Sequence, residues 1–213
     1  MPDEPLEFRF EMPELRVPQP PRDVPYAELE DHQARALLEA NGIGTDHAAL
    51  VAALEHPVEV IRAAAARTLG ATGDAGALDA LRALAGRNDD TASAEAAFAL
   101  ARLGERDEGE RALRALLDLP VDAYVAPLLA AGSLARLGDA AGVAAIERGL
   151  GSRNELVRRT AAKQLFHFVG VPGADAWALF ERALADDDRG VVAQARAELR
   201  ELDAPEARAL EAR

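Results

Sequence analysis

The sequence predicts an all-α fold, an α-solenoid of tandem helix pairs, and three observations support this prediction. Hydrophobic residues make up 49% of the 213 positions but aromatic residues only 4%, so the core must be built from small aliphatic side chains. Alanine is abundant from about position 27 onward, and it favours helices because it loses no side-chain entropy on folding. Similar helical segments also recur at a regular spacing, which is typical of repeat proteins.

The repeat is visible as four segments that align with one another and a fifth that aligns more weakly. Each contains a leucine at the same place, and successive leucines lie about 34, 34, 28 and 34 residues apart: Leu69, Leu103, Leu137, Leu165 and Leu199. A period of this length corresponds to one supersecondary unit of a solenoid. The aligned segment is expected to be the second helix of each unit. Apolar residues three positions apart, such as Leu78, Leu81 and Leu84, predict an amphipathic first helix.

These units divide the chain into an expected extended arm over residues 1–25 and a solenoid over residues 26–213. The expected bounds of the five repeats and the C-terminal cap are about 46–70, 74–104, 107–138, 139–170, 173–202 and 203–213. Glycines are expected to end second helices, aspartates to cap the N-termini of the helices that follow, and prolines to occupy first turns. These residues are Gly70, Gly104, Gly138, Asp74, Asp107, Asp139, Pro57 and Pro127.

The first 25 residues contain seven prolines, which exclude a long helix there. Residues 6–12 alternate apolar and charged side chains, a pattern typical of an extended segment with one apolar face. We expect Phe8, Phe10 and Met12 to be able to dock onto an apolar groove. Residues 26–41 are expected to form one further helix, which ends at Asn41 and Gly42.

The aligned segments resemble the short HEAT-like repeat of the type found in phycobilin lyases and in many bacterial scaffold proteins. The pattern is Val-Arg-x-x-Ala-Ala-x-x-Leu, followed by Gly and soon by Asp, and it matches best at residues 61–74 and 157–165. The resemblance implies a right-handed superhelix of antiparallel helix pairs whose second helices line a concave face. It implies almost nothing about activity, because the shared residues build the stack. Ala96 and Ala130 replace the Arg in repeats two and three. Phe166 replaces the Gly in repeat four, whose second helix is expected to continue to about Phe168.

The charge balance and the lack of cysteine exclude several classes of function. The chain has 24 Lys and Arg against 37 Asp and Glu, a net charge of −13, which disfavours nucleic acids and anionic membranes as partners. Without cysteine there is no disulfide, thiolate zinc site or iron–sulfur cluster. No apolar run reaches the roughly 18 residues of a membrane helix, and the N-terminus does not resemble a targeting peptide. We expect a cytoplasmic protein without a cofactor, and the oligomeric state stays open.

Residues suited to catalysis are scarce, so no enzymatic activity is expected. Two of the three serines fall inside predicted helices and one in a loop, and none lies on the strained turn of a nucleophile: Ser93, Ser133 and Ser152. His47 and His56 are nine residues apart, which does not place them on one helix face as a two-histidine metal site requires. Residues 186–188 are three aspartates without the alternating ligands of a calcium loop. They are expected to cap a helix, and no metal site is expected.

A basic cluster on the second helix of repeat four is one candidate binding site. Arg159, Lys163 and His167 are spaced four residues apart and therefore share one helix face. Apolar residues take the opposite face, so the cluster is expected to point toward the concave groove and to bind acidic groups of a protein partner. The alternative is an ordinary solvated face, or a ladder of Arg–Asp pairs between repeats.

The second helices of repeats two and three are apolar nearly all round, which suggests that something covers their groove side. The expected groove residues are Ala94, Ala97, Phe98, Ala101, Leu128 and Ala131. Three interpretations stay open at this point. A partner's segment binds there, the chain's own arm folds back through Phe8, Phe10 and Met12, or alanine only lets neighbouring helices approach closely.

Together these features predict a non-catalytic scaffold or adaptor that binds a peptide or helical segment of a partner protein in the concave groove. Two alternatives follow from the resemblance. An accessory lyase-like or metalloenzyme-assisting protein would need a roomy pocket, lined with aromatic residues in the case of a bilin lyase. A DNA-binding solenoid of the alkylation-repair type would need a basic concave stripe, whereas repeats two and three offer alanine there.

Overall fold

The computed structural model describes residues 15–19, 24–87 and 91–212, and it confirms the predicted all-α solenoid. This part of the chain contains twelve α-helices, three short 3₁₀ helices and no strand. Ten of the α-helices form successive pairs: α2 (His47–Ala53) with α3 (Glu59–Thr72), α4 (Leu78–Ala85) with α5 (Thr91–Arg102), α6 (Arg106–Leu116) with α7 (Ala126–Arg136), α8 (Val143–Leu150) with α9 (Glu155–Lys163), and α10 (Ala176–Leu184) with α11 (Arg189–Arg200). Helix α1 (Tyr26–Ala40) precedes the pairs and α12 (Pro205–Glu211) follows them.

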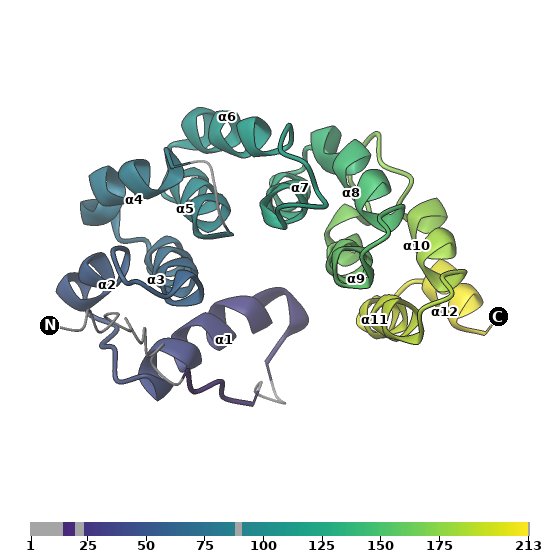
Figure 1. Ribbon diagram of the computed structural model, residues 1–213, viewed down its shortest axis with the longest axis horizontal. Coiled ribbons are helices and arrows are strands. Elements are labelled where there is room, and N and C mark those ends of the chain that lie inside the picture. Colours follow the sequence, from purple (N-terminus) through teal and green to yellow (C-terminus); the bar gives the residue numbers. More distant parts are fainter. Residues whose placement is uncertain (1–14, 20–23, 88–90, 213) are drawn as a thin grey trace, which may run out of the picture.

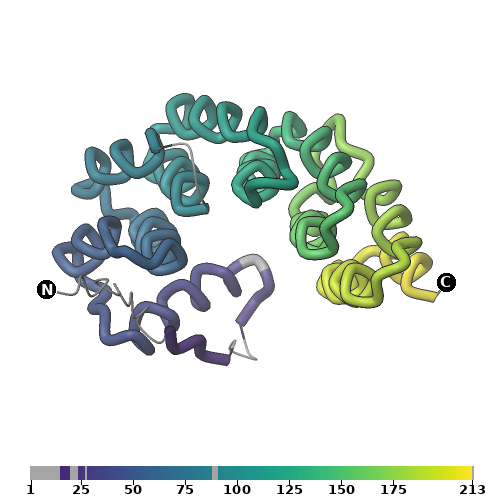
Figure 2. The backbone as a smooth tube through the Cα atoms, in the orientation of Figure 1, coloured from purple at the N-terminus to yellow at the C-terminus, as the bar shows by residue number. Residues whose placement is uncertain are grey.

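The five pairs are arranged in two layers that curve into an arc (Figure 1). The first helices of the pairs form the outer, convex layer, and the second helices form the inner, concave layer. The tube in Figure 2 follows the same arc from one end to the other, with α12 at the C-terminal end. The 3₁₀ helices η1 (Ala75–Ala77) and η2 (Ala140–Gly142) lead into α4 and α8, and η3 (Leu165–Phe168) extends the inner helix α9.

Small residues at the helix crossings explain how a core with so few aromatic side chains closes. A Cβ atom added at Gly70 in α3 would lie 2.9 Å from Cα and Cβ of Ala99 in α5, so two inner helices touch nearly backbone to backbone there. At Gly109 in α6 such an atom would lie 2.5 Å from the carbonyl oxygen of Ala97. Real Cβ contacts are essentially never that short, and overpacking of this kind is destabilising. Alanine and glycine therefore set the spacing of both layers.

The predicted helix ends are correct in several places and wrong in three. Gly104 and Gly138 have φ of 100° and 83°, the left-handed conformation expected after a helix. The side chain of Asp74 accepts a hydrogen bond from the backbone N–H of Gly76, and that of Asp139 from Ala141, as N-caps do.

Gly70 does not end its helix, because α3 continues to Thr72 and Gly73 takes the left-handed position instead, with φ of 75°. Asp107 is not a cap either, because it lies in the first turn of α6 behind Glu105. Pro127 stands in the first turn of α7 as predicted, whereas Pro57 precedes the N-cap of α3.

Helix α1 forms close to the predicted bounds, but its position in space was not predicted. It lies on the concave side of the arc, against the inner layer (Figure 1). Leu38 is fully buried in the same apolar cluster as α3 and α5, together with Ala34 and Leu37. Ahead of α1, the backbone of Arg16 exchanges two hydrogen bonds with the side chain of Asn41, of 3.0 and 2.8 Å. Phe8, Phe10 and Met12 lie outside the described residues.

Candidate binding cavity on the concave face

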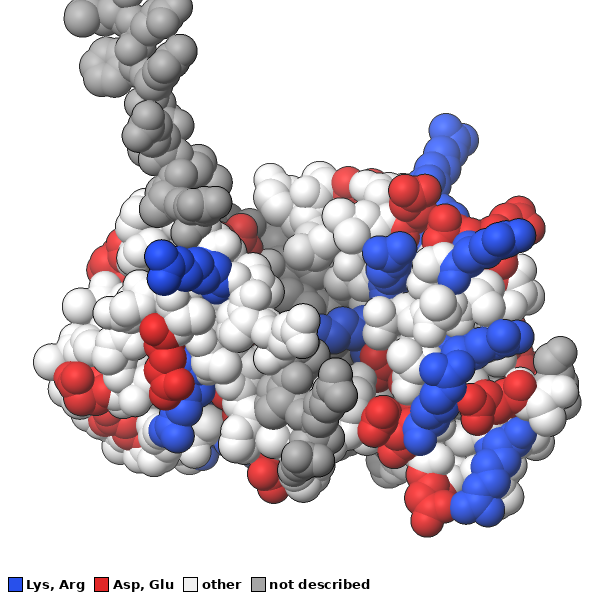
Figure 3. Space-filling model, turned by 90° about the horizontal axis from the view of Figure 1, so that it is seen from below, with Lys and Arg blue, Asp and Glu red and all other residues white. Residues whose placement is uncertain are grey.

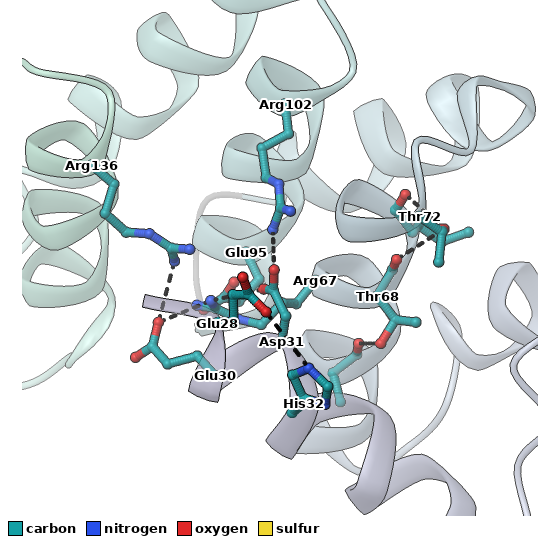
Figure 4. Close-up of polar contacts among 12 residues, drawn as sticks. Glu28, Glu30, Asp31, His32, Arg67, Thr68, Thr72, Glu95, Arg102 and Arg136 are labelled. Carbon is teal, nitrogen blue, oxygen red and sulfur yellow. Dashed lines mark hydrogen bonds and ion pairs between the residues drawn. The ribbon is translucent and has the colours of Figure 1, made fainter. Parts of the chain in front are cut away.

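The N-terminal half of α1 is held in the groove by charge. The Glu30 carboxylate lies 2.9 Å from the guanidinium of Arg67 on α3 and 3.2 Å from that of Arg136 on α7. Its second oxygen lies 4.0 Å from the ammonium of Lys163 at the end of α9. Figure 4 shows Arg67 and Arg136 reaching Glu30 from two inner helices. One acidic side chain of α1 thus bridges three repeats.

Neighbouring carboxylates complete this cluster. Arg67, whose side chain is only 10% exposed, also pairs with Glu95 of α5 at 2.5 Å. Asp31, next to Glu30, lies 2.8 Å from Arg102 of α5 and 3.5 Å from Arg67 (Figure 4). A buried charge is costly unless it is paired and hydrogen-bonded. The three inner arginines are therefore compensated largely by carboxylates that α1 brings into the groove.

The cluster shifts the pKa values of its members in the directions that this pairing demands. Burial alone would raise the pKa of Glu30, but Arg67, protonated His167, Arg136 and Lys163 together lower it from 4.5 to about 2. Burial would lower the pKa of Arg67, but Glu95 and Glu30 raise it above its ordinary value. Arg136 is different, because burial and the neighbouring Arg67 lower its pKa. Glu30 is therefore ionised at neutral pH and acts as the shared counter-ion.

The first residue of α1 reaches the C-terminal repeats. The ring of Tyr26 packs against Phe166 of η3 at 4.7 Å between ring centres, and its hydroxyl donates a hydrogen bond to Glu198 of α11. Glu198 also accepts from the side-chain amide of Gln194 at 2.7 Å. It is 1% exposed, and burial raises its pKa from 4.5 to about 7. Helix α1 therefore spans the groove from α3 to α11.

A cavity of about 410 Å³ stays open between α1 and the inner helices. One part of its wall is apolar, with side chains from α1, α3 and α7. The polar part includes the ion pairs of Glu30, Arg67, Glu95 and Arg136 and, around the end of α9, a group formed by Ser133, Lys163, Gln164 and His167. We call this last group the polar corner. Burial lowers the pKa of His167 from 6.5 to about 4, against the opposing effect of Glu30, so its imidazole is neutral at pH 7.

The structure divides the predicted groove residues into two groups. The carbonyl oxygen of Ala97 and the Cβ of Ala101 lie against Gly109 of α6, and Ala131 lies against Gly142 of η2, so all three contact the first helical segment of the next repeat. Leu128 lies against Gly149 of α8, and Ala94 is fully buried in the apolar cluster. None of these five residues lines the cavity.

Phe98 and two members of the basic trio lie at or beside the cavity. The Phe98 ring is 4% exposed and is covered by Arg136, whose guanidinium carbon lies 4.3 Å from the ring centre. Lys163 and His167 line the cavity. Arg159 is exposed, and its guanidinium lies over Gly190 at the start of α11. Only two members of the trio therefore meet at the cavity.

Five residues that organise this site were not predicted: Glu30, Arg67, Arg136, Tyr26 and Glu198. For the arginines, the sequence did contain a pattern that could have indicated their role. An arginine stands one or two positions before the repeat leucine in three successive repeats, as Arg67, Arg102 and Arg136. Equivalent positions of successive inner helices point to the same side of a solenoid. An acidic helix that precedes them is the counterpart such a basic row requires.

The family model for HEAT repeats matches residues 30–101 and, in a second and overlapping match, residues 47–127. The chain is a HEAT-like repeat protein. The first match begins inside α1 and the second ends at the start of α7. Together they cover the first two helix pairs, and of the third pair they cover α6 and only the start of α7. A search of curated proteins finds no match to the chain. HEAT-repeat proteins are commonly scaffolds for protein interactions and typically non-catalytic.

Two searches of the described residues bear on other kinds of site. None of the helices in this part of the chain is both long and apolar enough to span a bilayer. Across the same residues, no cluster of three or more His, Asp or Glu side chains is arranged to hold a metal ion. Two residues that were not expected to bind metal, His47 and Asp186, have other contacts. His47 lies 2.7 Å from Asp74, and Asp186 pairs with Arg158 at 2.8 Å.

Proposed function

We propose that this HEAT-like repeat protein is a non-catalytic scaffold that binds a segment of a partner protein on its concave face. The observation that carries the proposal is α1 itself. The inner layer holds this helix through apolar contacts at Leu38 and through ion pairs at Glu30. A groove that binds one amphipathic, acidic helix of its own chain has the chemistry to bind another segment of the same kind.

The surface left open beside α1 fits an acidic partner. Val60 at the start of α3 is 41% exposed and lines the cavity, which offers an apolar contact. Lys163 is 48% exposed, and Arg159 is exposed one turn away on the same helix. Among the described residues, the guanidinium of Arg159 forms no ion pair, whereas that of the adjacent Arg158 pairs with Asp186. These two cations are the proposed contacts for acidic side chains of the partner.

A protein partner fits this surface better than a nucleic acid does. Viewed from below, basic and acidic side chains alternate over the C-terminal helices (Figure 3). In the groove, Arg67, Arg102 and Arg136 are already paired with Glu30, Asp31 and Glu95. Binding to phosphate groups relies on cations that are free to displace counter-ions.

The proposal is tested by a photo-cross-linking amino acid placed at Val60 in cells that express the protein. A control places it at Arg111, on the exposed side of the convex helix α6. We expect one dominant protein adduct from position 60, its absence from position 111, and its loss when Arg159→Glu is added. Identical adducts from both positions, or an adduct unchanged by Arg159→Glu, would contradict the proposal.

A further inference from the structure

Beyond the scaffold function, we propose that the cavity beneath α1 binds a small amphipathic carboxylate. In this arrangement the carboxylate lies against the polar corner, Ser133, Lys163, Gln164 and His167. The hydrocarbon body lies on the apolar wall formed by α1, α3 and α7.

Two nearly covered polar side chains of this corner open onto the cavity. Gln164 is 4% exposed and Ser133 is 5% exposed. Both line the cavity, and neither contributes to the fully buried, unpartnered polar atoms of the described residues. A few polar groups in an apolar site fix the orientation of a bound molecule. A carboxylate in the cavity can accept hydrogen bonds from the Ser133 hydroxyl and the Gln164 amide.

The position of Gln164 is built into the fold by Gly132. A Cβ atom at residue 132 would lie 2.0 Å from Oε1 of Gln164 and 3.0 Å from its Cδ, so any larger residue would displace the amide. Inner helices α7 and η3 are thus brought close enough for Gln164 to lie in the corner beside Ser133.

The charges around the cavity select a single negative charge. Arg67 pairs with Glu95, and Arg136 with Glu30, at 2.5 and 3.2 Å. These two pairs leave Lys163, which lies 4.0 Å from Glu30 and is 48% exposed, as the cation able to turn toward a ligand. His167, neutral at pH 7, adds a ring nitrogen. A monovalent carboxylate balances this excess charge, whereas a phosphate dianion would leave one charge uncompensated beside Glu30.

The rest of the cavity suits a hydrocarbon chain. Its apolar wall includes Leu37, Val60, Ala63, Ala64 and Leu129, together with Val17 and Pro18 ahead of α1. The volume of about 410 Å³ lies within the range of small-molecule sites, roughly 300–1,000 Å³. Ligand sites of this kind combine a mostly apolar lining with a few polar groups that fix orientation. A medium-length fatty acid has both parts.

Isothermal titration calorimetry of the full chain with octanoate, below its micellar concentration, tests the proposal. Octan-1-ol, with the same hydrocarbon chain and no charge, is the matched ligand. We expect saturable 1:1 binding of octanoate and at least about tenfold weaker binding of the alcohol. Lys163→Met and Ser133→Ala should each weaken octanoate binding, the former about tenfold. Arg111→Met, which removes an exposed cation from convex α6, should leave it unchanged.

Three outcomes would overturn the proposal: no saturable binding of octanoate, equal binding of octanol, or equal weakening by Lys163→Met and Arg111→Met. Lys163 is half exposed and supports no core packing, so its variant is expected to fold, and circular dichroism verifies this. Because the purified chain binds octanoate without any partner, the result is independent of the cross-linking test of the scaffold function.

Discussion

Replacing Glu198 with Gln should remove a contribution that lowers the stability of the protein as the pH rises from about 4.5 to 7. The Glu198 carboxyl is 1% exposed and joins the start of α1 to α11 through Tyr26. Burial raises its pKa from 4.5 to about 7. Its two hydrogen-bond donors, Tyr26 and Gln194, are neutral and oppose this effect only in part.

The sign of the effect follows from the raised pKa. The folded protein holds a proton on Glu198 at pH values where the unfolded chain has released it, so this contribution to stability is complete below pH 4.5 and is lost as the pH rises to about 7. At about 1.4 kcal/mol for each pH unit, the loss amounts to about 3 kcal/mol. Gln turns an NH₂ group toward Gln194, which costs about 1 kcal/mol. The variant should therefore be about 2 kcal/mol more stable than the parent at pH 8.

Urea unfolding followed by far-ultraviolet circular dichroism, at several values from about pH 4.5 to 8, measures this difference. Glu206→Gln on α12 is the matched control, because it removes the same charge from an exposed position. We expect the gain in unfolding free energy of Glu198→Gln over the parent to grow by about 3 kcal/mol from about pH 4.5 to 7, whereas the difference between the control and the parent should stay nearly constant. If both variants follow the parent's pH profile in parallel, the protonated, buried state of Glu198 is refuted.

Three further predictions concern α1 and the core. Glu30→Gln should cost up to about 3 kcal/mol at pH 7, and the cost should vanish as the pH falls from 4.5 to about 2, because the ion pairs lower the Glu30 pKa to that value. Urea unfolding at pH 7 and at about pH 2 measures this cost in stability, and an equal cost at both pH values would contradict the prediction. Gly109→Ala should destabilise by about 1–3 kcal/mol because its Cβ would meet the Ala97 carbonyl. At an exposed helical position, replacing Gly with Ala normally stabilises a protein. A gain in stability at residue 109 would therefore show that α5 and α6 lie farther apart than described. Phe98→Ala should cost about 3–5 kcal/mol in thermal or urea unfolding, and a cost below about 1 kcal/mol would place the ring in solvent.

The helix pairs could be predicted because their contacts are local. In a solenoid each repeat contacts its neighbours, so a periodic leucine such as Leu69 or Leu103 reports both the helix and its packing. The position of α1 is different in kind. Glu30 and Arg136 are separated by 106 residues, and the apolar pattern of α1 sets which face is buried but not which helices bury it.

The apolar inner helices misled the prediction of the groove for a physical reason. An inner helix such as α5 packs against its own outer partner α4, the next outer helix α6 and the inner helices on both sides. Residues such as Ala97 are therefore covered without any ligand. The polar side chains of the concave face carry more information, because Arg67 or Gln164 is placed among apolar helices at a cost that only a partner group offsets.

The central claim, that α1 crosses the concave face from α3 to α11, is tested most directly by a chemical cross-link. The chain contains no cysteine, so Tyr26→Cys and Phe166→Cys introduce a unique pair where the two rings now lie 4.7 Å apart. A short bismaleimide should join them within one molecule, rapidly and at high dilution, giving a shift in gel mobility that the pair Tyr26→Cys with Arg111→Cys does not show. Equal reaction of both pairs, or cross-links only between molecules, would contradict the account.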